Sequence, residues 1–442
     1  MSMINAFEAG RASLTERERE LIARRERLLG PAYRLFYEHP VHLVRGDGVW
    51  LYDEGGNPYL DVYNNVAGVG HCHPHVVEAL ARQAATLNTH TRYLHETVLD
   101  YAEALLGQLP PHLGHAMFTC SGSEANDLAY RIAQHCTGGS GFIVTRLAYH
   151  GATKVIAELS PSLGAGVGAA PNVRTVPAPD GYRADGRDVG DDLAAAVAVA
   201  LEDFRAHGVR PAALLVDTIF SSDGVFADPR GFLRKAVDVM RAAGGLFIAD
   251  EVQAGFGRTG DAMWGFERHQ LAPDIVTMGK PMGDGHPIAG LAVRPEVIRE
   301  FARTRYFNTF GGNPVSAAAG LAVLQVLERE RLRENALAVG DYLRKRLRLL
   351  AQSHEIIGDV RGAGLFIGVE LVRDRSTRAP ATSETSRVVN GLRERRVLIS
   401  GSGPAANILK IRPPLVFSRD NADLFVAALD EVLHELDQSI PG

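Results

Sequence analysis

The chain has 442 residues, of which 46% are hydrophobic and 22% are charged, a composition typical of a folded globular protein large enough for two or more subdomains. Its net charge of −5 lacks the excess of lysine and arginine on which nucleic-acid binding depends, so no nucleic-acid partner is expected. No apolar stretch reaches the length of a membrane span, so no membrane partner is expected either.

The number of cysteines and the charge of the first residues indicate a reducing, cytoplasmic location. Cys72, Cys120 and Cys136 cannot all form pairs, and their spacing does not match a metal site. The charged run Arg17-Glu18-Arg19-Glu20 stands where a signal peptide would need apolar residues. We therefore expect a cytoplasmic protein that binds no metal.

Residues 1–60 are predicted to form an N-terminal arm and a hairpin segment that joins the smaller domain. A charged helix is expected over residues 13–29, because Ser13 and Glu16 have the spacing of a capping box. Short strands are expected at residues 41–44 and 49–52, on either side of a glycine-rich turn.

Residues 61–312 are predicted to form a large domain with a mostly parallel sheet. Apolar runs alternate there with segments of helical period, such as residues 231–243, which is the pattern of strands joined by helical crossovers. The expected strands lie at 115–119, 142–145, 213–216, 246–249, 275–278 and 290–293.

Residues 313–442 are predicted to form a smaller α/β domain. Asn313 and Pro314 open its first helix as cap and first helical residue. Strands are expected near residues 365–372 and 408–412, and a final helix from about residue 420.

Two of the buried strands are followed by a residue with catalytic chemistry. Residues 246–249 lead to Asp250, and residues 275–278 lead to Lys280. The carboxyl ends of parallel strands meet in the crevice that binds ligands. A lysine amine there can form a Schiff base with pyridoxal phosphate, while a carboxylate holds the pyridine nitrogen protonated. Taken singly, Asp250 could cap a turn and Lys280 could be a solvated loop residue.

Three further segments suit the same cofactor. Ser121-Gly122-Ser123-Glu124 combines a glycine turn with a capping box, so the free amides of the following helix can hold a phosphate. Tyr149-His150-Gly151 places a flat ring beside a glycine. The glycine-rich loop around Thr309 offers a hydroxyl and free amides. An ordinary capped helix and a plain hinge loop are the competing interpretations of the first and third segments.

Together these segments resemble the class III, ornithine-aminotransferase-like family of fold type I pyridoxal phosphate enzymes, over nearly the whole chain. The resemblance implies an α/β fold with a large domain, built on a mostly parallel mixed sheet, and a smaller α/β domain. The motifs that carry it occur in family order: residues 70–74, 121–126, 149–151, 250–253, 255–260, 279–280, 309–314 and 361–365.

The resemblance also implies roles for single residues. Lys280 would form the Schiff base and Asp250 would pair with the pyridine nitrogen. The remaining cofactor contacts would come from Ser121, Gly122 and Ser123 at the phosphate, Tyr149 and Val252 on the two ring faces, Gln253 at the ring hydroxyl, and His150 beside them. Thr309 would reach the phosphate of a neighbouring subunit, which implies a homodimer with its site at the subunit interface.

The resemblance assigns substrate binding to Arg412, which matches the arginine that binds a substrate carboxylate in many relatives. Its competing interpretation is an ion pair with a structural acid. The chain departs from the family at Asp217-Thr218-Ile219-Phe220-Ser221-Ser222, where several relatives have Glu-Pro-Ile-Gln-x-Glu. Ser222 thus replaces the glutamate that can pair with the substrate arginine, which puts that gating mechanism in doubt.

The motifs at residues 64–74, 280–287 and 307–314 look like the branch that contains ethanolamine-phosphate and phosphohydroxylysine phospho-lyases as well as transaminases. The expected function is a pyridoxal phosphate-dependent aminotransferase that moves an amino group from an amino acid or amine to an oxo acid or aldehyde. Two alternatives stay open at this point: a phospho-lyase acting on a phosphorylated amino alcohol such as phosphoethanolamine, and a cofactor-binding scaffold without turnover.

Overall fold

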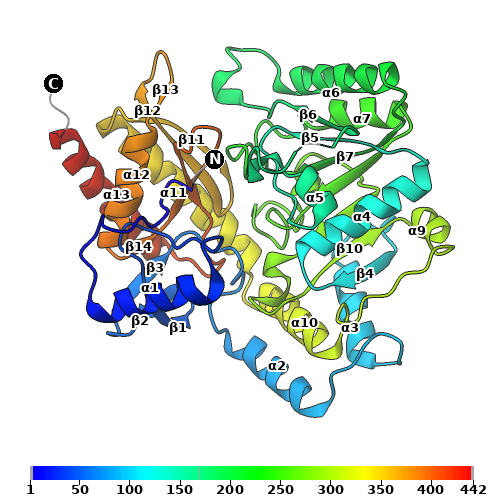
Figure 1. Cartoon of the computed structure of the whole chain (residues 1–442), viewed down its shortest axis with the longest axis horizontal. Helices are drawn as coiled ribbons and strands as arrows, with labels where there is room; N and C mark the ends of the chain where they lie inside the picture. The colour runs from blue at the N-terminus through cyan, green and yellow to red at the C-terminus, as the bar shows by residue number, and fades with distance from the viewer. Residues whose placement is uncertain (1–2, 169, 440–442) are drawn as a thin grey trace.

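The computed structural model describes residues 3–168 and 170–439. Two α/β bodies lie side by side (Figure 1). The middle of the chain forms one of them, whereas the N-terminal and C-terminal segments come together in the other. The boundaries near residues 60 and 312 stay a prediction, since helix α10 (Pro314–Arg329), beyond the second of them, packs against α2 (Pro74–Thr86) and α3 (Glu96–Leu106) of the larger body.

A seven-stranded sheet forms the centre of the larger body. Parallel pairing joins β6, β5, β7, β8 and β9 in that spatial order, while β10 runs antiparallel to both β9 and β4. The sheet is therefore mixed and mostly parallel, as expected. Its strands are β4 (His115–Thr119), β5 (Gly141–Thr145), β6 (Val173–Val176), β7 (Pro211–Asp217), β8 (Leu246–Asp250), β9 (Ile275–Met278) and β10 (Ala289–Val293).

Hydrophobic cores cover both faces of this sheet. Every residue of β5 is buried, and neighbours along it face opposite ways, since Ile143 packs in one core cluster and Phe142 and Val144 in another. The helices that supply these cores are α2 (Pro74–Thr86), α3 (Glu96–Leu106), α4 (Gly122–Thr137), α5 (Lys154–Glu158), α6 (Val189–Ala206), α7 (Arg234–Ala242), α8 (Gly265–Arg268), α9 (Pro295–Phe301) and α10 (Pro314–Arg329).

The smaller body holds two sheets. An antiparallel sheet has the order β11 (Ile357–Ala363), β12 (Phe366–Asp374), β16 (Ile408–Ile411) and β15 (Ser400–Ser402), with β13 (Ala379–Pro380) at the end of β12. The other sheet joins the N-terminal strands β1 (Leu43–Asp47), β2 (Trp50–Asp53) and β3 (Pro58–Asp61) to β14 (Val397–Leu398). The helices here are α11 (Leu332–Ser353), α12 (Thr382–Glu394) and α13 (Arg419–Ser439). Within the described residues, no helix has the length and apolarity needed to cross a bilayer.

The N-terminal helix starts later than expected. Helix α1 spans Glu16–Leu29, and Thr15 with Glu18 forms its capping box in place of Ser13 with Glu16. Both pairs have the required spacing, but Glu18 also contacts the His39 ring at 3.0 Å. A tertiary contact therefore accompanies the observed box, and sequence spacing cannot show it.

The turn after β9 is tied to a distant loop through Asp284. This turn is a short 3-10 helix, η3 (Lys280–Gly283), and Asp284 follows it with a φ of 51°. The Asp284 carboxylate accepts a hydrogen bond from the amide of Val69 at 3.0 Å. Burial raises the pKa of Asp284 to about 7, although the Val69 amide and His71 act in the opposite direction.

This raised pKa predicts how folding stability depends on pH. The protonated form of Asp284 is favoured in the folded state, so its stabilising contribution is complete below the ordinary pKa of 3.8 and is lost as pH rises to about 7. We expect the wild-type unfolding midpoint to fall relative to that of Asp284→Asn between about pH 4 and pH 7. Denaturation of both proteins across that range measures the difference. Parallel pH curves for the two proteins would contradict the prediction.

Candidate active site

The site forms where the carboxyl ends of three neighbouring strands meet. Asp217 ends β7 and Asp250 ends β8, and the two are register partners. Lys280 opens the turn after β9 and has a φ of 23°. One cavity is lined by Gly122, Ser123, Tyr149, His150, Gly151, Asp217, Asp250, Val252, Gln253 and Lys280. The structure thus brings together most of the residues expected from the sequence.

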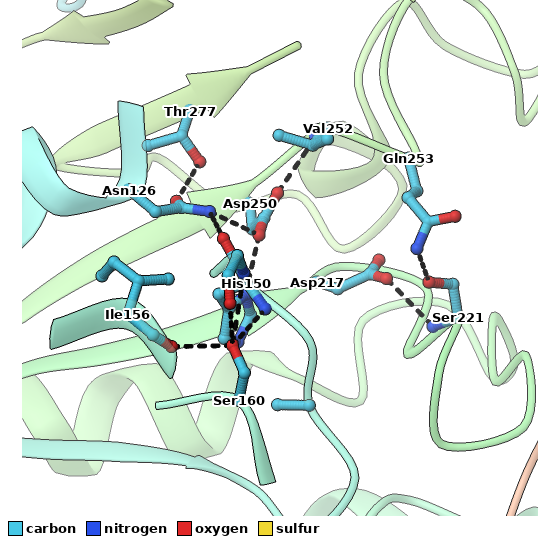
Figure 2. A network of polar contacts seen from close by, with 12 residues as sticks. Asn126, His150, Ile156, Ser160, Asp217, Ser221, Asp250, Val252, Gln253 and Thr277 are labelled. Atoms are coloured by element: carbon cyan, nitrogen blue, oxygen red, sulfur yellow. Dashed lines mark hydrogen bonds and ion pairs between the residues drawn. The ribbon is translucent and has the colours of Figure 1, made fainter. Parts of the chain in front are cut away.

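Hydrogen bonds from three elements fix the Asp250 carboxylate (Figure 2). One oxygen accepts from Asn126 Nδ2 at 3.0 Å and lies 2.7 Å from His150 Nδ1, and the other accepts from the Val252 amide at 3.0 Å. Asn126 is oriented in turn by the hydroxyl of Thr277, at 2.6 Å. Asp250 is 4% exposed, so this buried carboxylate has a single orientation at the edge of the cavity.

His150 contacts the catalytic carboxylate, while its other ring nitrogen remains open. Its Nε2 is buried and has no hydrogen-bond partner within the described parts of the chain. The Ser160 hydroxyl accepts from the His150 amide at 2.9 Å and from the Gly151 amide at 3.2 Å. Sequence reasoning missed Ser160, because an isolated serine on a loop carries no motif.

An anion cup forms at the start of α4. Ser121 caps the helix, and its capping box with Glu124 is present as expected. Two glycines give the cup its close packing: a Cβ on Gly122 would lie a tight 3.1 Å from Val252 Cγ2, and one on Gly151, whose φ is 143°, would clash with Ser123 Oγ at 2.5 Å. Ser121 itself does not line the cavity. The first-turn amides at the positive end of the helix dipole suit a phosphate.

The environment of Lys280 favours its neutral, nucleophilic amine. Burial first, and then the Arg412 cation, lower the pKa of Lys280, although the carboxylates of Asp250 and Asp217 act to raise it. Asp217 was not among the expected site residues. Burial and the charge of Asp250 raise its pKa. Its position at the end of the buried run 213–216 was the signal that could have identified it, as it identified Asp250.

Asp217 also fixes the turn that carries Ser221, which in turn contacts Gln253. Its carboxylate accepts from the amides of Ile219 and Ser221 at 3.1 and 3.0 Å. The Ser221 hydroxyl then accepts from Gln253 Nε2 at 2.5 Å, as Figure 2 shows. Gln253 is therefore held by protein contacts on its amide nitrogen.

Arg412, directly after β16, makes no ion pair with a carboxylate in the described residues. Its Nη1 donates to the oxygens of Asn65 and Gln253, at 2.9 and 2.5 Å, and its guanidinium lies 4.3 Å from the centre of the Tyr63 ring. Its Nε is buried without a partner. The competing interpretation of Arg412, an ion pair with a structural acid, is therefore not observed.

Lys410 is a second buried cation that sequence reasoning did not single out. It lies within β16, two residues before Arg412, and the Arg412 cation acts on its amine. Lys410 is 6% exposed, and the described residues give its ammonium neither a hydrogen bond nor an ion pair; the Phe366 ring lies 5.7 Å away. A lysine in the middle of a buried apolar strand was the available signal.

Thr309 is the one expected cofactor residue that lies away from these groups. It is exposed, outside the cavity of its own chain, on the loop that also exposes Phe310. Its expected contact involves a neighbouring subunit and stays a prediction.

The arrangement suits pyridoxal phosphate. One cavity combines a glycine cradle at the start of α4, a fixed carboxylate beside the open His150 Nε2, and the primary amine of Lys280. These are the donors and acceptors that a phosphate, a protonated pyridine and an aldehyde require.

Comparisons with known proteins agree with this geometry. The model of the family "Aminotransferase class-III" matches residues 36–433. A Drosophila melanogaster protein named alanine–glyoxylate aminotransferase 2-like is 43% identical, covering 94% of this chain and 87% of its own. A Caenorhabditis elegans protein named ethanolamine-phosphate phospho-lyase homolog 1 is 39% identical, covering 94% of this chain and 93% of its own.

Solved structures show the same fold. A phospholyase from Arthrobacter in complex with phosphoethanolamine is 44% identical, with a TM-score of 0.91 over 95% of this chain and all of its own. A thermostable omega transaminase is 26% identical, with a TM-score of 0.83 over 91% of this chain and 94% of its own. The expected fold, enzyme class and pyridoxal phosphate cofactor are thereby confirmed. The chain belongs to the class III aminotransferase family of fold type I pyridoxal phosphate enzymes.

Proposed function

We propose that this enzyme moves an amino group between a small amine or amino acid that carries a second, anionic group and an oxo acid or aldehyde. The observation that carries the proposal is that Lys280, Asp250 and the amino end of α4 line one cavity, with two unpaired cations, Arg412 and Lys410, on the small-domain side. The cofactor supplies, when bound, an aldehyde and a ring that withdraws electrons.

The chain's residues divide the work of holding that cofactor. The amides of Gly122 and Ser123 would bind its phosphate, and Asp250 would accept from the protonated pyridine nitrogen. Tyr149 and Val252 would contact its ring. Of the other expected contacts, Gln253 serves the ring hydroxyl, whereas Ser121 and His150 act through their neighbours, by capping α4 and by orienting Asp250.

Lys280 moves the proton. Its lowered pKa increases the neutral fraction of the amine, and in that form Nζ can accept the proton from the substrate carbon and return it elsewhere. Asp250 keeps one orientation during that step because three hydrogen-bonded partners hold it.

Arg412 and Lys410 bind the anionic group of the substrate. The partners of Arg412 are the neutral amides of Asn65 and Gln253, which leave its charge uncompensated. Burial and the Arg412 cation lower the pKa of Lys410 well below its ordinary value, and a bound anion would offset both causes. With serine at position 222, no glutamate occupies the family's gating position.

A second candidate function is elimination of phosphate from a phosphorylated amino alcohol. The Arg412 cation, together with a Lys410 amine that a bound anion would favour in its charged form, suits a doubly charged phosphate better than a single carboxylate. The Arthrobacter phospholyase also aligns with nearly the whole chain. In this reaction Lys280 again accepts a proton from the substrate carbon. The neighbouring carbon–oxygen bond then breaks, and inorganic phosphate leaves with the electron pair.

The proposal includes a homodimer in the cytoplasm. Exposed apolar side chains, among them Tyr93, Leu94 and Phe310, support an interface beside Thr309, which would then reach the partner's phosphate. The three free cysteines support a reducing compartment. Two relatives are named as mitochondrial, so localisation of the tagged chain in its own cell is the test.

We predict that Lys280→Ala removes the visible absorption of the cofactor-loaded protein and slows turnover roughly 10³-fold or more, because the Schiff-base amine and proton carrier are lost. Circular dichroism should remain unchanged. The matched control is Lys345→Ala, on the exposed side of α11, which should retain absorption and activity. Retention of the visible band in Lys280→Ala would refute the assigned role.

The two candidate reactions differ in their products. We expect the loaded enzyme, given a panel of amines, amino acids and phosphoethanolamine with an oxo acid, to form a new amino acid without releasing phosphate. Chromatography and a phosphate assay follow both products in one reaction. Phosphate release without amino-group transfer would overturn the first candidate and select the second.

Arg412→Gln should lower kcat/KM for anionic amines about 10- to 100-fold, the loss of one charge-assisted hydrogen bond, and leave uncharged amines nearly unchanged. The exposed Arg419 provides the control Arg419→Gln, which should affect neither class. Equal losses for anionic and uncharged amines would mean that Arg412 is structural.

A further inference from the structure

A cluster of histidine and aspartate side chains joins two helices of the small domain, away from the active site. Helix α13 lies at the outer side of this domain and leads to the C-terminus (Figure 1). Its residues Asp430, His434 and Asp437 are four and then three positions apart, so they lie on one helix face. Opposite them, His354 caps the carboxyl end of α11.

The geometry points to a zinc site formed by His354, His434 and Asp437. Each of the three can place one ligand atom within 4.8 Å of the others. His354 Nδ1 and Asp437 Oδ2 are already 3.2 Å apart, close to the roughly 3.3 Å that separates two ligands of a tetrahedral zinc with bonds of about 2.0–2.1 Å. The His434 side chain is exposed and free to rotate by the remaining distance.

The carboxylate of Asp430 would orient His354 as a zinc ligand. Asp430 Oδ1 lies 2.6 Å from His354 Nε2. With zinc on Nδ1, the ring would keep its proton on Nε2 and donate it to Asp430. Carboxylates in this position orient the ligating histidines of zinc sites. The His354 side chain is fully buried, and Arg375 binds the carbonyl oxygens of His354 and Glu355 at 2.9 and 3.0 Å. The ligand is therefore rigidly placed.

Charge and ligand type both favour zinc at this cluster. Two carboxylates meet two imidazole rings at the cluster, and one divalent cation would compensate the carboxylates. Two nitrogen ligands exclude a preference for magnesium or calcium, which take oxygen ligands. An imidazolium at His354, clamped between Asp430 and Asp437, is the competing interpretation. That clamp leaves His434 with only a loose contact, because its Nε2 lies 3.6 Å from Asp430 Oδ1, beyond hydrogen-bonding distance. The His434 ring packs 4.7 Å from the His354 ring, centre to centre.

The site would fasten the C-terminal helix to α11. It is independent of the proposed reaction, because none of its residues lines the cofactor cavity. Zinc binding should therefore slow opening of α13 while leaving the cofactor's absorption unchanged.

The test titrates zinc into the full-length, cofactor-loaded protein by calorimetry and follows amide hydrogen exchange in α13. We expect the wild type to bind one more equivalent than His434→Ala or Asp437→Asn, and zinc to slow exchange in α13 of the wild type only. Asp430→Asn, which keeps all three ligands, should weaken affinity 10- to 100-fold.

The matched control is His207→Ala. His207 is an exposed histidine with an aspartate four residues away, at 3.4 Å, on another helix end, and its loss should leave the extra equivalent in place. Equal zinc stoichiometry in the wild type and His434→Ala would overturn the proposal. Exchange in α13 that is insensitive to zinc would also overturn it and favour the imidazolium clamp.

Discussion

The fixed orientation of the Asp250 carboxylate is the constraint on which the rest of the site depends. Three contacts fix it: the side-chain amide of Asn126 on α4, the His150 ring on the loop after β5, and the backbone amide of Val252 in the turn that follows Asp250. Because Thr277 on β9 orients Asn126, the same network also reaches the strand that leads to Lys280. The acid and the amine are thus positioned by neighbouring strands of one sheet.

The order of the strands in the sheet determines which functional side chains meet. The parallel order of β7, β8 and β9 brings Asp217, Asp250 and Lys280 to one edge, where low polarity strengthens charge interactions. Lys280 responds to that environment with a lowered pKa and Asp217 with a raised one. Arg412 and Lys410 of the small domain have no ion-pair partner in the described structure, so the proposed substrate binding would involve both bodies.

Much of the large domain and of the candidate site was predictable, because the apolar runs and capping residues of the sequence agree with the tertiary structure. Buried apolar runs located six strands of the large sheet, and the capping box located the start of α4. Strand β6 (Val173–Val176) was missed because it is four residues long and carries Arg174. The wrong cap of α1 arose from two overlapping boxes. Lys410 could have been singled out as a lysine within the apolar strand β16, but its proximity to the site depends on tertiary packing. The proposed zinc ligands lie at the end of α11 and on α13, far apart in the chain, so no spacing rule joins them. Thr309 depends on a second chain.

The most direct test of the account is the protonation of the cofactor's pyridine nitrogen, measured by its ¹⁵N chemical shift in the loaded wild type and in Asp250→Asn. The account predicts a protonated nitrogen in the wild type and an unprotonated one in the variant, with the cofactor still attached to Lys280 in both. The same shift in both proteins would show that Asp250 and Lys280 do not act on one bound cofactor.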